Sequence, residues 1–138
     1  RLLIDADVVV DGSDNFATRL AVSDAATAMR IPLVSAAIGQ FQIQIATFRG
    51  WEPGRPCYRC YVGDAFDAEE CDSCSELGVL GAAAGLAGTW AALEAIRQIA
   101  RFGEDAAGKL HLFDSLKPEM RSLNIVKDPA CRTCGTRS

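Results

Sequence analysis

The sequence predicts a mixed α/β fold that starts with a parallel βαβ unit and continues into further strands. Two short apolar runs rich in β-branched residues, at 6–12 and 31–39, flank a segment at 13–30 that has helical periodicity. The links between the three segments are tight, and strands joined through a helix pair in parallel with a right-handed crossover. The stretch "FQIQIATF" at 41–48 alternates in polarity, which predicts an additional, half-buried strand.

Local signals define where these first elements begin and end. The first strand is ended by Gly12, and three residues that cap helices follow it directly: Ser13, Asp14 and Asn15. Pro32 stands at the start of the second strand, a position that tolerates a residue without an amide N–H. The boundaries of the βαβ unit therefore agree with its periodicity.

A long helix is predicted at 79–103, and its first half is almost wholly apolar. Glycines at 81, 85 and 88 would let another backbone approach closely, so we expect this half to be buried against the sheet or a second subunit. Gly103 is expected to end the helix. Two strands at 109–115 and 119–126 follow and can form a hairpin.

The segments between these elements give weaker signals. Residues 49–60 are rich in Gly and Pro and predict a loop, and residues 61–78 are acidic and irregular. His111 is the only histidine of the chain, and we expect it to be a surface or edge residue without a functional role.

Composition limits the classes of function. The 138 residues are enough for one domain with a modest core, and 49% of them are hydrophobic. A net charge of −4 argues against a nucleic-acid partner, which would require a basic surface. The sequence contains no uncharged apolar run of about 18 residues, so we expect no membrane span.

All six cysteines lie in three Cys-x-x-Cys pairs. They are the first pair (Cys57 and Cys60), the middle pair (Cys71 and Cys74) and the last pair (Cys131 and Cys134). Three disulfides would be typical of a short secreted domain with little core, which does not describe this chain. Two intervening residues are the usual spacing of a zinc knuckle. We therefore expect a zinc site in a reduced, cytoplasmic compartment.

The charges beside each pair indicate which cysteines bind the metal. Four thiolates around Zn²⁺ leave a net charge of −2, which nearby cations stabilise and nearby acids oppose. Cations flank the first and last pairs: Arg55, Arg59, Lys127, Arg132 and Arg137. Acids surround the middle pair: Asp67, Glu69, Glu70, Asp72 and Glu76. The first and last pairs are thus the predicted zinc ligands, and the alternative joins the first pair to the middle pair at a normal ribbon spacing.

The middle pair then has three possible roles. Cys71 and Cys74 can be plain thiols on a loop, or one of them can be a nucleophile or sulfur acceptor. They can also form a redox dithiol, because the predicted helix begins nearby, although the acids oppose the lowered thiol pKa that such chemistry needs.

At this point the residues resemble a known family. "DVVVDGSDNFATR" is similar to the Asp-x-x-Asp-Asn-x-x-x-Arg segment of the ThiF/MoeB/HesA family, the bacterial relatives of ubiquitin-activating enzymes. "IPLVSAAIGQFQIQIATF", "PCYRC", "CSELGVLG", "ALEAIR" and "DPACRTCG" follow in the family's order. The resemblance runs from one end of the chain to the other.

The resemblance implies a Rossmann-like sheet that binds ATP and Mg²⁺. It also implies adenylylation of the C-terminal Gly-Gly carboxylate of a ubiquitin-like sulfur carrier, of the MoaD or ThiS type, for molybdopterin, thiamin or related pathways. Family members form homodimers, and their structural zinc is held by pairs that match the first and last pairs here.

Single residues match the family's site positions. Asp11 corresponds to its metal-binding aspartate, at the carboxyl end of a parallel strand where it would face the nucleotide crevice. Asp14 and Asn15 are candidates for cofactor binding, although both can equally be helix caps. Cys74 matches the family's loop cysteine and is a candidate catalytic thiol. Arg19 is expected to pair with an acid or reach the site.

The chain also departs from the family pattern. The glycine-rich phosphate loop, the ribose-binding acid and the ATP-contacting Arg and Lys of complete members do not occur in it. We therefore expect residues 1–138 to be the C-terminal part of such an adenylation domain, an incomplete domain that is inactive alone. Two functions of other classes remain possible: a non-enzymatic zinc-binding interaction module, and a thiol-disulfide oxidoreductase that uses Cys71 and Cys74.

Overall fold

A computed structural model describes residues 2–63 and 78–136. In chain order its elements are β1 (Val9–Asp11), α1 (Phe16–Ala28), β2 (Leu33–Ile38), β3 (Gln42–Phe48), α2 (Tyr58–Val62), α4 (Gly81–Ala100), β4 (Lys109–Asp114) and β5 (Glu119–Asn124). The five strands form one sheet in the order β1-β2-β3-β4-β5. β1 and β2 are parallel, and each later neighbour is antiparallel to the one before it.

The βαβ unit forms as predicted because its local signals agree with its packing. Asn15 caps α1, and its side-chain oxygen accepts a hydrogen bond from the amide of Thr18 at 2.8 Å. The hairpin of β4 and β5 is also confirmed, with Leu110 opposite Leu123 in the register. The mixed α/β prediction is therefore correct for the described residues.

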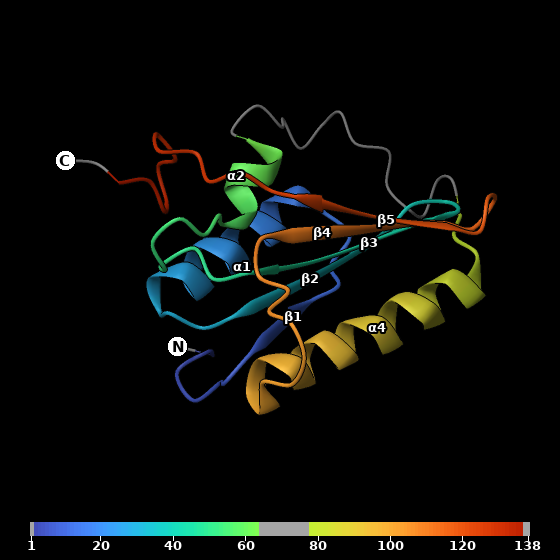
Figure 1. Ribbon diagram of the computed structural model, residues 1–138, viewed down its shortest axis with the longest axis horizontal. Coiled ribbons are helices and arrows are strands. Elements are labelled where there is room, and N and C mark those ends of the chain that lie inside the picture. The colour runs from blue at the N-terminus through green and yellow to red at the C-terminus, as the bar shows by residue number, and fades with distance from the viewer. Residues whose placement is uncertain (1, 64–77, 137–138) are drawn as a thin grey trace.

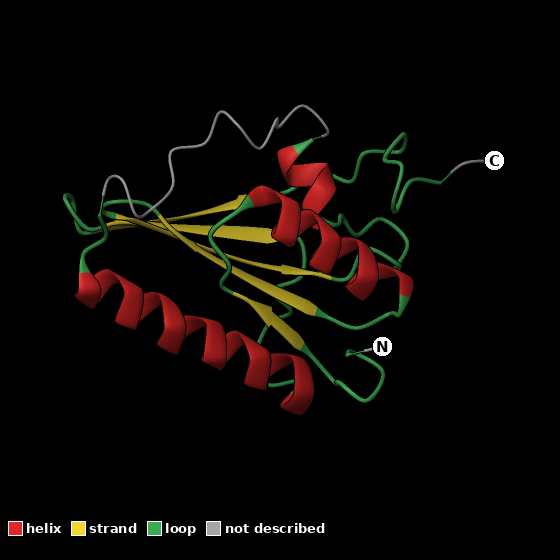
Figure 2. Cartoon of the chain, turned by 180° about the vertical axis from the view of Figure 1, so that it is seen from behind, coloured by secondary structure: helices red, strands yellow, loops and turns green. Residues whose placement is uncertain are grey.

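The sheet separates two helical layers (Figure 1 and Figure 2). α4 covers one face, where alanines at 83, 87 and 91 pack on Val34, Ile43 and Ile45. α1 and α2 cover the other face, where Ala26 and Tyr58 pack with side chains of β2, β3 and β4. Alternate residues of each strand point to opposite faces, so both layers are buried against one sheet.

Helix α4 corrects two expectations. A Cβ atom added at Gly81, Gly85 or Gly88 would meet nothing within 4 Å, so no backbone within the described residues approaches these glycines. Small alanine side chains make the close packing on the sheet instead. The helix ends at Ala100, before the expected range closes at Gly103, and Arg101 caps it with φ 52°.

Two smaller differences concern α2 and His111. The segment 58–62 was expected to be loop, but it forms a short helix that starts within the first cysteine pair. His111 lies on β4, between β3 and β5, so the prediction of an edge position is wrong. Its ring is half-buried, lies 5.5 Å from the ring of Trp90, and contacts the Ser122 hydroxyl at 2.7 Å.

Within residues 2–63 and 78–136, no helix has the length and apolar character that crossing a bilayer requires.

Candidate functional site

Four cysteines that are far apart in the sequence meet at one point of the structure. The Sγ atoms of the first and last pairs all lie within 4.8 Å of one another. Cys57 and Cys131 are 3.7 Å apart at sulfur, and Cys60 and Cys134 are 3.4 Å apart. We call this group the cysteine centre.

The spacing of the sulfur atoms fits a tetrahedral metal ion. Zn–S bonds of about 2.3 Å in a tetrahedron place the sulfurs about 3.8 Å from one another. The two Sγ–Sγ distances given above are close to this value. All four candidate ligands are thiols, which are soft ligands that suit Zn²⁺. The residues therefore fit a closed, four-coordinate site. The two pairs predicted from their flanking cations are the two that meet.

Close approach of the backbone shapes the cysteine centre. A Cβ atom on Gly50 would lie 2.7 Å from Cβ of Cys57 and 3.3 Å from Cβ of Cys134. Gly135 closes the turn of the last pair, since its amide donates to the carbonyl of Cys131 at 2.8 Å. The Lys127 ammonium donates to the carbonyls of Gly50 and Arg55 at 2.9 and 3.0 Å, which fastens the chain's end to the loop.

The thiols have different environments. Burial raises the pKa of Cys57 far above its usual range and that of Cys134 to about 11. Burial also acts to raise the pKa of Cys131, but amides of Cys134 and Thr133 donate to that sulfur, so its pKa is lowered overall. The amide of Asp128 donates to Cys60 at 3.4 Å. Amide donors of this kind stabilise thiolate ligands, and a divalent cation would displace the remaining thiol protons.

A polar network beside the cysteine centre was not foreseen. The buried guanidinium of Arg59 donates to the Asp24 carboxylate of α1 at 2.7 Å and to the Thr133 hydroxyl at 3.1 Å. Thr133 in turn donates to Asp24 at 2.8 Å. Sequence reasoning identified Arg59 only as a cation near the centre, because nothing local signals a partner 35 residues away.

The middle pair, Cys71 and Cys74, lies outside the described residues.

A groove of about 440 Å³ lies at the carboxyl ends of β1 and β2. Its lining comes from the β1–α1 link and first turn of α1, the end of β2 and one face of α4: Gly12, Ser13, Asp14, Asn15, Phe16, Arg19, Ala36, Ala37, Ile38, Ala84, Ala87 and Gly88. Parallel strands and the amino end of a helix meet there, which is where α/β sheets bind ligands.

The candidate residues of the βαβ unit take different positions at this groove. Asp14 is exposed and lines it, and Asn15 lines it while capping α1. Asp11 is 6% exposed and is not among the lining residues; it directly precedes Gly12 of the lining, and its Oδ1 accepts from the amide of Ser13 at 2.9 Å. Arg19 is buried and donates to the Ser35 hydroxyl at 3.1 Å, so it stabilises the groove wall, and no acid among the described residues pairs with it.

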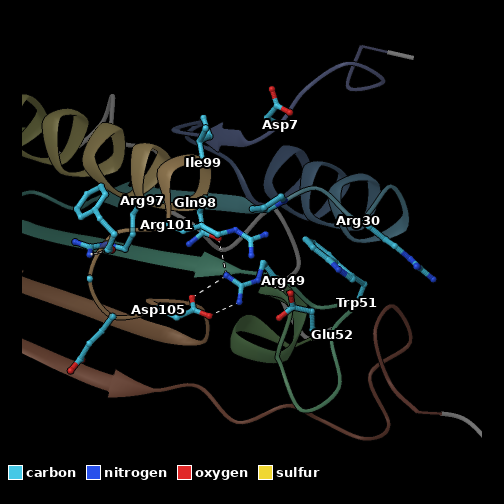
Figure 3. Close-up of a pocket in the computed structure, with 14 residues that line it drawn as sticks. Asp7, Arg30, Arg49, Trp51, Glu52, Arg97, Gln98, Ile99, Arg101 and Asp105 are labelled. Carbon is cyan, nitrogen blue, oxygen red and sulfur yellow. Dashed lines mark hydrogen bonds and ion pairs between the residues drawn. The ribbon is translucent and has the colours of Figure 1, made fainter.

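A second cavity, of about 510 Å³, lies at the opposite end of the sheet (Figure 3). Its central cation is Arg49, which donates to Glu52 at 2.9 Å, to Gln98 at 2.8 Å and to Asp105 at 2.5 and 3.0 Å. The hydrogen bond between Arg49 and Asp105 holds the pKa of Asp105 down at about 2. Because Arg49 is already paired and the cavity faces the amino ends of the parallel strands, the smaller groove is the better ligand site.

Comparison with known proteins gives one consistent result. The ThiF family model matches residues 1–133. The sulfur carrier protein adenylyltransferase of Thermus thermophilus is 41% identical over 133 residues, which cover 94% of this chain and 49% of that protein. The molybdopterin-synthase adenylyltransferase of Escherichia coli is 34% identical over 134 residues, covering 97% and 53%. The chain thus spans about half the length of these two relatives.

A solved structure agrees at the level of the fold. The crystal structure of Escherichia coli MccB superposes with a TM-score of 0.74 over 96% of this chain and 40% of that one. The sequence identity is 17%, so this likeness concerns the mixed α/β architecture alone.

Proposed function

The chain belongs to the ThiF family, and we propose that it is the C-terminal part of an adenylyltransferase that activates a ubiquitin-like sulfur carrier. The proposed reaction uses ATP and Mg²⁺ to adenylylate the C-terminal Gly-Gly carboxylate of a MoaD- or ThiS-type carrier. Its pathway would be molybdopterin, thiamin or related sulfur transfer. Support comes from two relatives at 41% and 34% identity, which are named as adenylyltransferases for a sulfur carrier and for molybdopterin synthase.

The groove at the carboxyl ends of β1 and β2 is the observation that carries this proposal. It brings the amino end of α1, with its N–H groups, beside carboxylate and amide side chains from a single turn. N–H groups at a helix amino end favour phosphate oxygens, and a carboxylate at a strand end suits Mg²⁺. The groove thus offers part of what a nucleotide triphosphate with its metal ion requires.

The proposed chemistry assigns roles to three residues near the groove: Asp11, Asp14 and Asn15. The carrier carboxylate attacks the α-phosphorus of ATP, the bond from that phosphorus to the bridging oxygen breaks, and pyrophosphate leaves. Bound Mg²⁺ would neutralise the phosphate charge. Asp11 is the proposed Mg²⁺ ligand, since its Oδ1 is oriented by Ser13. Asp14 is the second candidate, and Asn15 contributes chiefly by fixing the helix end.

The cysteine centre is proposed as a structural zinc site. Its four ligands come from two cysteine pairs that are far apart in the sequence: Cys57 and Cys131 are separated by 74 residues. Thiols fill every coordination position. A closed tetrahedral site has no place for a substrate, so its contribution is to the folding free energy. Cys74, outside the described residues, stays a proposed catalytic thiol on the strength of the family resemblance.

A homodimer is also part of the proposal. Apolar side chains of α4 are exposed on the face that points away from the sheet: Leu86, Leu93, Ile96 and Ile99, at 46%, 45%, 54% and 60%. Exposed apolar side chains that follow one another along a helix support association of two copies of the chain. Sedimentation velocity over a range of concentrations tests it, and a single monomeric species throughout would contradict it.

Exchange of labelled pyrophosphate into ATP tests the main proposal. The longer parent protein, mixed with its carrier and Mg-ATP, should catalyse exchange, and the exchange should stop when the carrier's terminal Gly-Gly is removed. Replacing Asp11 with Asn should lower the rate by about 100-fold, whereas Asp5→Asn removes an exposed carboxylate and serves as the control. We expect no exchange from the 138-residue chain alone, because it contains no glycine-rich phosphate loop. A parent protein that catalyses no carrier-dependent exchange would refute the proposed function.

A further inference from the structure

The two halves of the cysteine centre share one feature beyond their thiols. Arg59 and Thr133 each stand directly before the second cysteine of their pair. Both side chains contact the same carboxylate, that of Asp24, at 2.7 and 2.8 Å. They also contact each other at 3.1 Å. A single acid on α1 therefore binds both Cys-x-x-Cys turns, and it can do so only while those turns are together.

The Asp24 contacts are stronger than a typical surface ion pair. Asp24 is 40% exposed at its side chain, but the Arg59 side chain is only 5% exposed. Removing a carboxylate that a buried guanidinium binds has a high cost, because the cation has lost its water. Three mutually bonded groups also polarise one another, so the network holds its geometry better than an isolated pair.

Helix α1 connects this network to the groove. Asp24 lies five residues after Arg19, about 7.5 Å along the helix axis. Arg19 fixes the first part of the helix to β2 through Ser35 and the carbonyl of Ala36. The first turn of α1 lines the groove, and its last part carries Asp24. Helix α1 thus has one attachment in each half, at Arg19 and at Asp24.

We propose that Asp24 is a positioning residue that joins helix α1 to the assembled cysteine centre, so that metal binding orders α1 and the groove wall formed by its first turn. The proposal rests on metal binding at the cysteine centre. Without a metal ion, the four thiols have no shared ligand, and the two Cys-x-x-Cys turns are joined only by weaker contacts such as the hydrogen bonds of Lys127 and Arg59. The simultaneous contact of Asp24 with Arg59 and Thr133 is then less stable. The coupling is reciprocal, so an ordered α1 also favours metal binding.

Hydrogen exchange of the 138-residue chain, with Zn²⁺ and with a chelator, tests this proposal. In the wild type, Zn²⁺ should slow exchange both in the two Cys-x-x-Cys turns and in α1. In Asp24→Asn the turns should still respond, while the effect on α1 should fall about ten-fold, as expected for the loss of one charge-assisted hydrogen bond. Asp24→Glu keeps the carboxylate and should restore part of the effect. Asp5→Asn makes the same charge change at an exposed site and should behave as the wild type.

Cobalt absorption separates the possible failures. The thiolate-to-Co²⁺ charge-transfer band reports whether the centre binds metal in each variant. A normal band with an unchanged α1 response in Asp24→Asn would overturn this proposal alone. No band in the wild type would overturn the metal site and this proposal together. If Asp24→Asn does not fold, Thr133→Val removes one of the two contacts with a side chain of similar shape, and an α1 response equal to the wild type would then overturn the proposal.

Discussion

Gly50 offers a sharp test of the cysteine centre, because the space beside it is already occupied. A methyl group there would lie 2.7 Å from Cβ of Cys57, 3.2 Å from its Cα and 3.3 Å from Cβ of Cys134. None of these atoms is the free end of a flexible side chain, so the contact can be relieved only by moving a metal ligand or the backbone. We therefore expect Gly50→Ala to strain the assembled centre.

The size of the effect follows from the geometry. Forcing one extra methyl group into a packed site costs about 1 to 3 kcal/mol. The two shortest contacts are to Cys57 and the third is to Cys134, so the strain acts on a ligand from each turn and should appear as lost metal affinity. A free-energy change of that size corresponds to a dissociation constant about 5- to 150-fold higher. Competition between the protein and a chromophoric chelator for Zn²⁺ measures this constant directly.

Gly85→Ala is the matched control. A Cβ atom at Gly85 meets nothing within 4 Å, and the residue lies inside helix α4. Alanine is favoured over glycine in a helix by about 1 kcal/mol, so this variant should melt slightly higher and bind Zn²⁺ as the wild type does. Unchanged Zn²⁺ affinity in Gly50→Ala would show that the two turns do not pack around Gly50 when metal is bound, and the reasoning would be wrong.

Three further predictions concern metal content, the cap of α1 and acid stability. Replacing both cysteines of the last pair with serine should empty the metal site, whereas the same change in the middle pair should leave one metal ion per chain. Elemental analysis measures the metal content of both variants, and the reverse pattern would refute the ligand assignment. Asn15→Ala removes the side-chain bond to the Thr18 amide and should lower the free energy of unfolding by about 1 kcal/mol in urea titrations, with no loss counting against the cap. Asp105 has its pKa lowered from 3.8 to about 2, chiefly by its hydrogen bond to Arg49, so its contribution is present above about pH 4 and is lost as the pH falls through about 2. Since that side chain is 40% exposed, we expect only about 1 kcal/mol after discounting for solvent screening, and Asp105→Asn should flatten the fall in stability over this range.

The sequence by itself determined the βαβ unit, the alternating strand at 41–48 and the choice of the first and last cysteine pairs. These features depend on information that lies close together in the chain: side-chain periodicity, helix caps, and charges beside each pair of thiols.

Tertiary structure alone decided the features that join distant segments. His111 lies on an interior strand because β4 pairs with β3 as well as with its hairpin partner β5, and no local pattern encodes the pairing with β3. The glycines of α4 face open space because the alanines of the helix pack on the sheet. Both faces of the helix carry small residues, so composition alone does not show which face packs on the sheet. Asp24 reads as an ordinary solvated acid until the fold brings it to Arg59 and Thr133. Such contacts form only after the chain has closed loops of many residues, so their partners are set by packing and not by spacing.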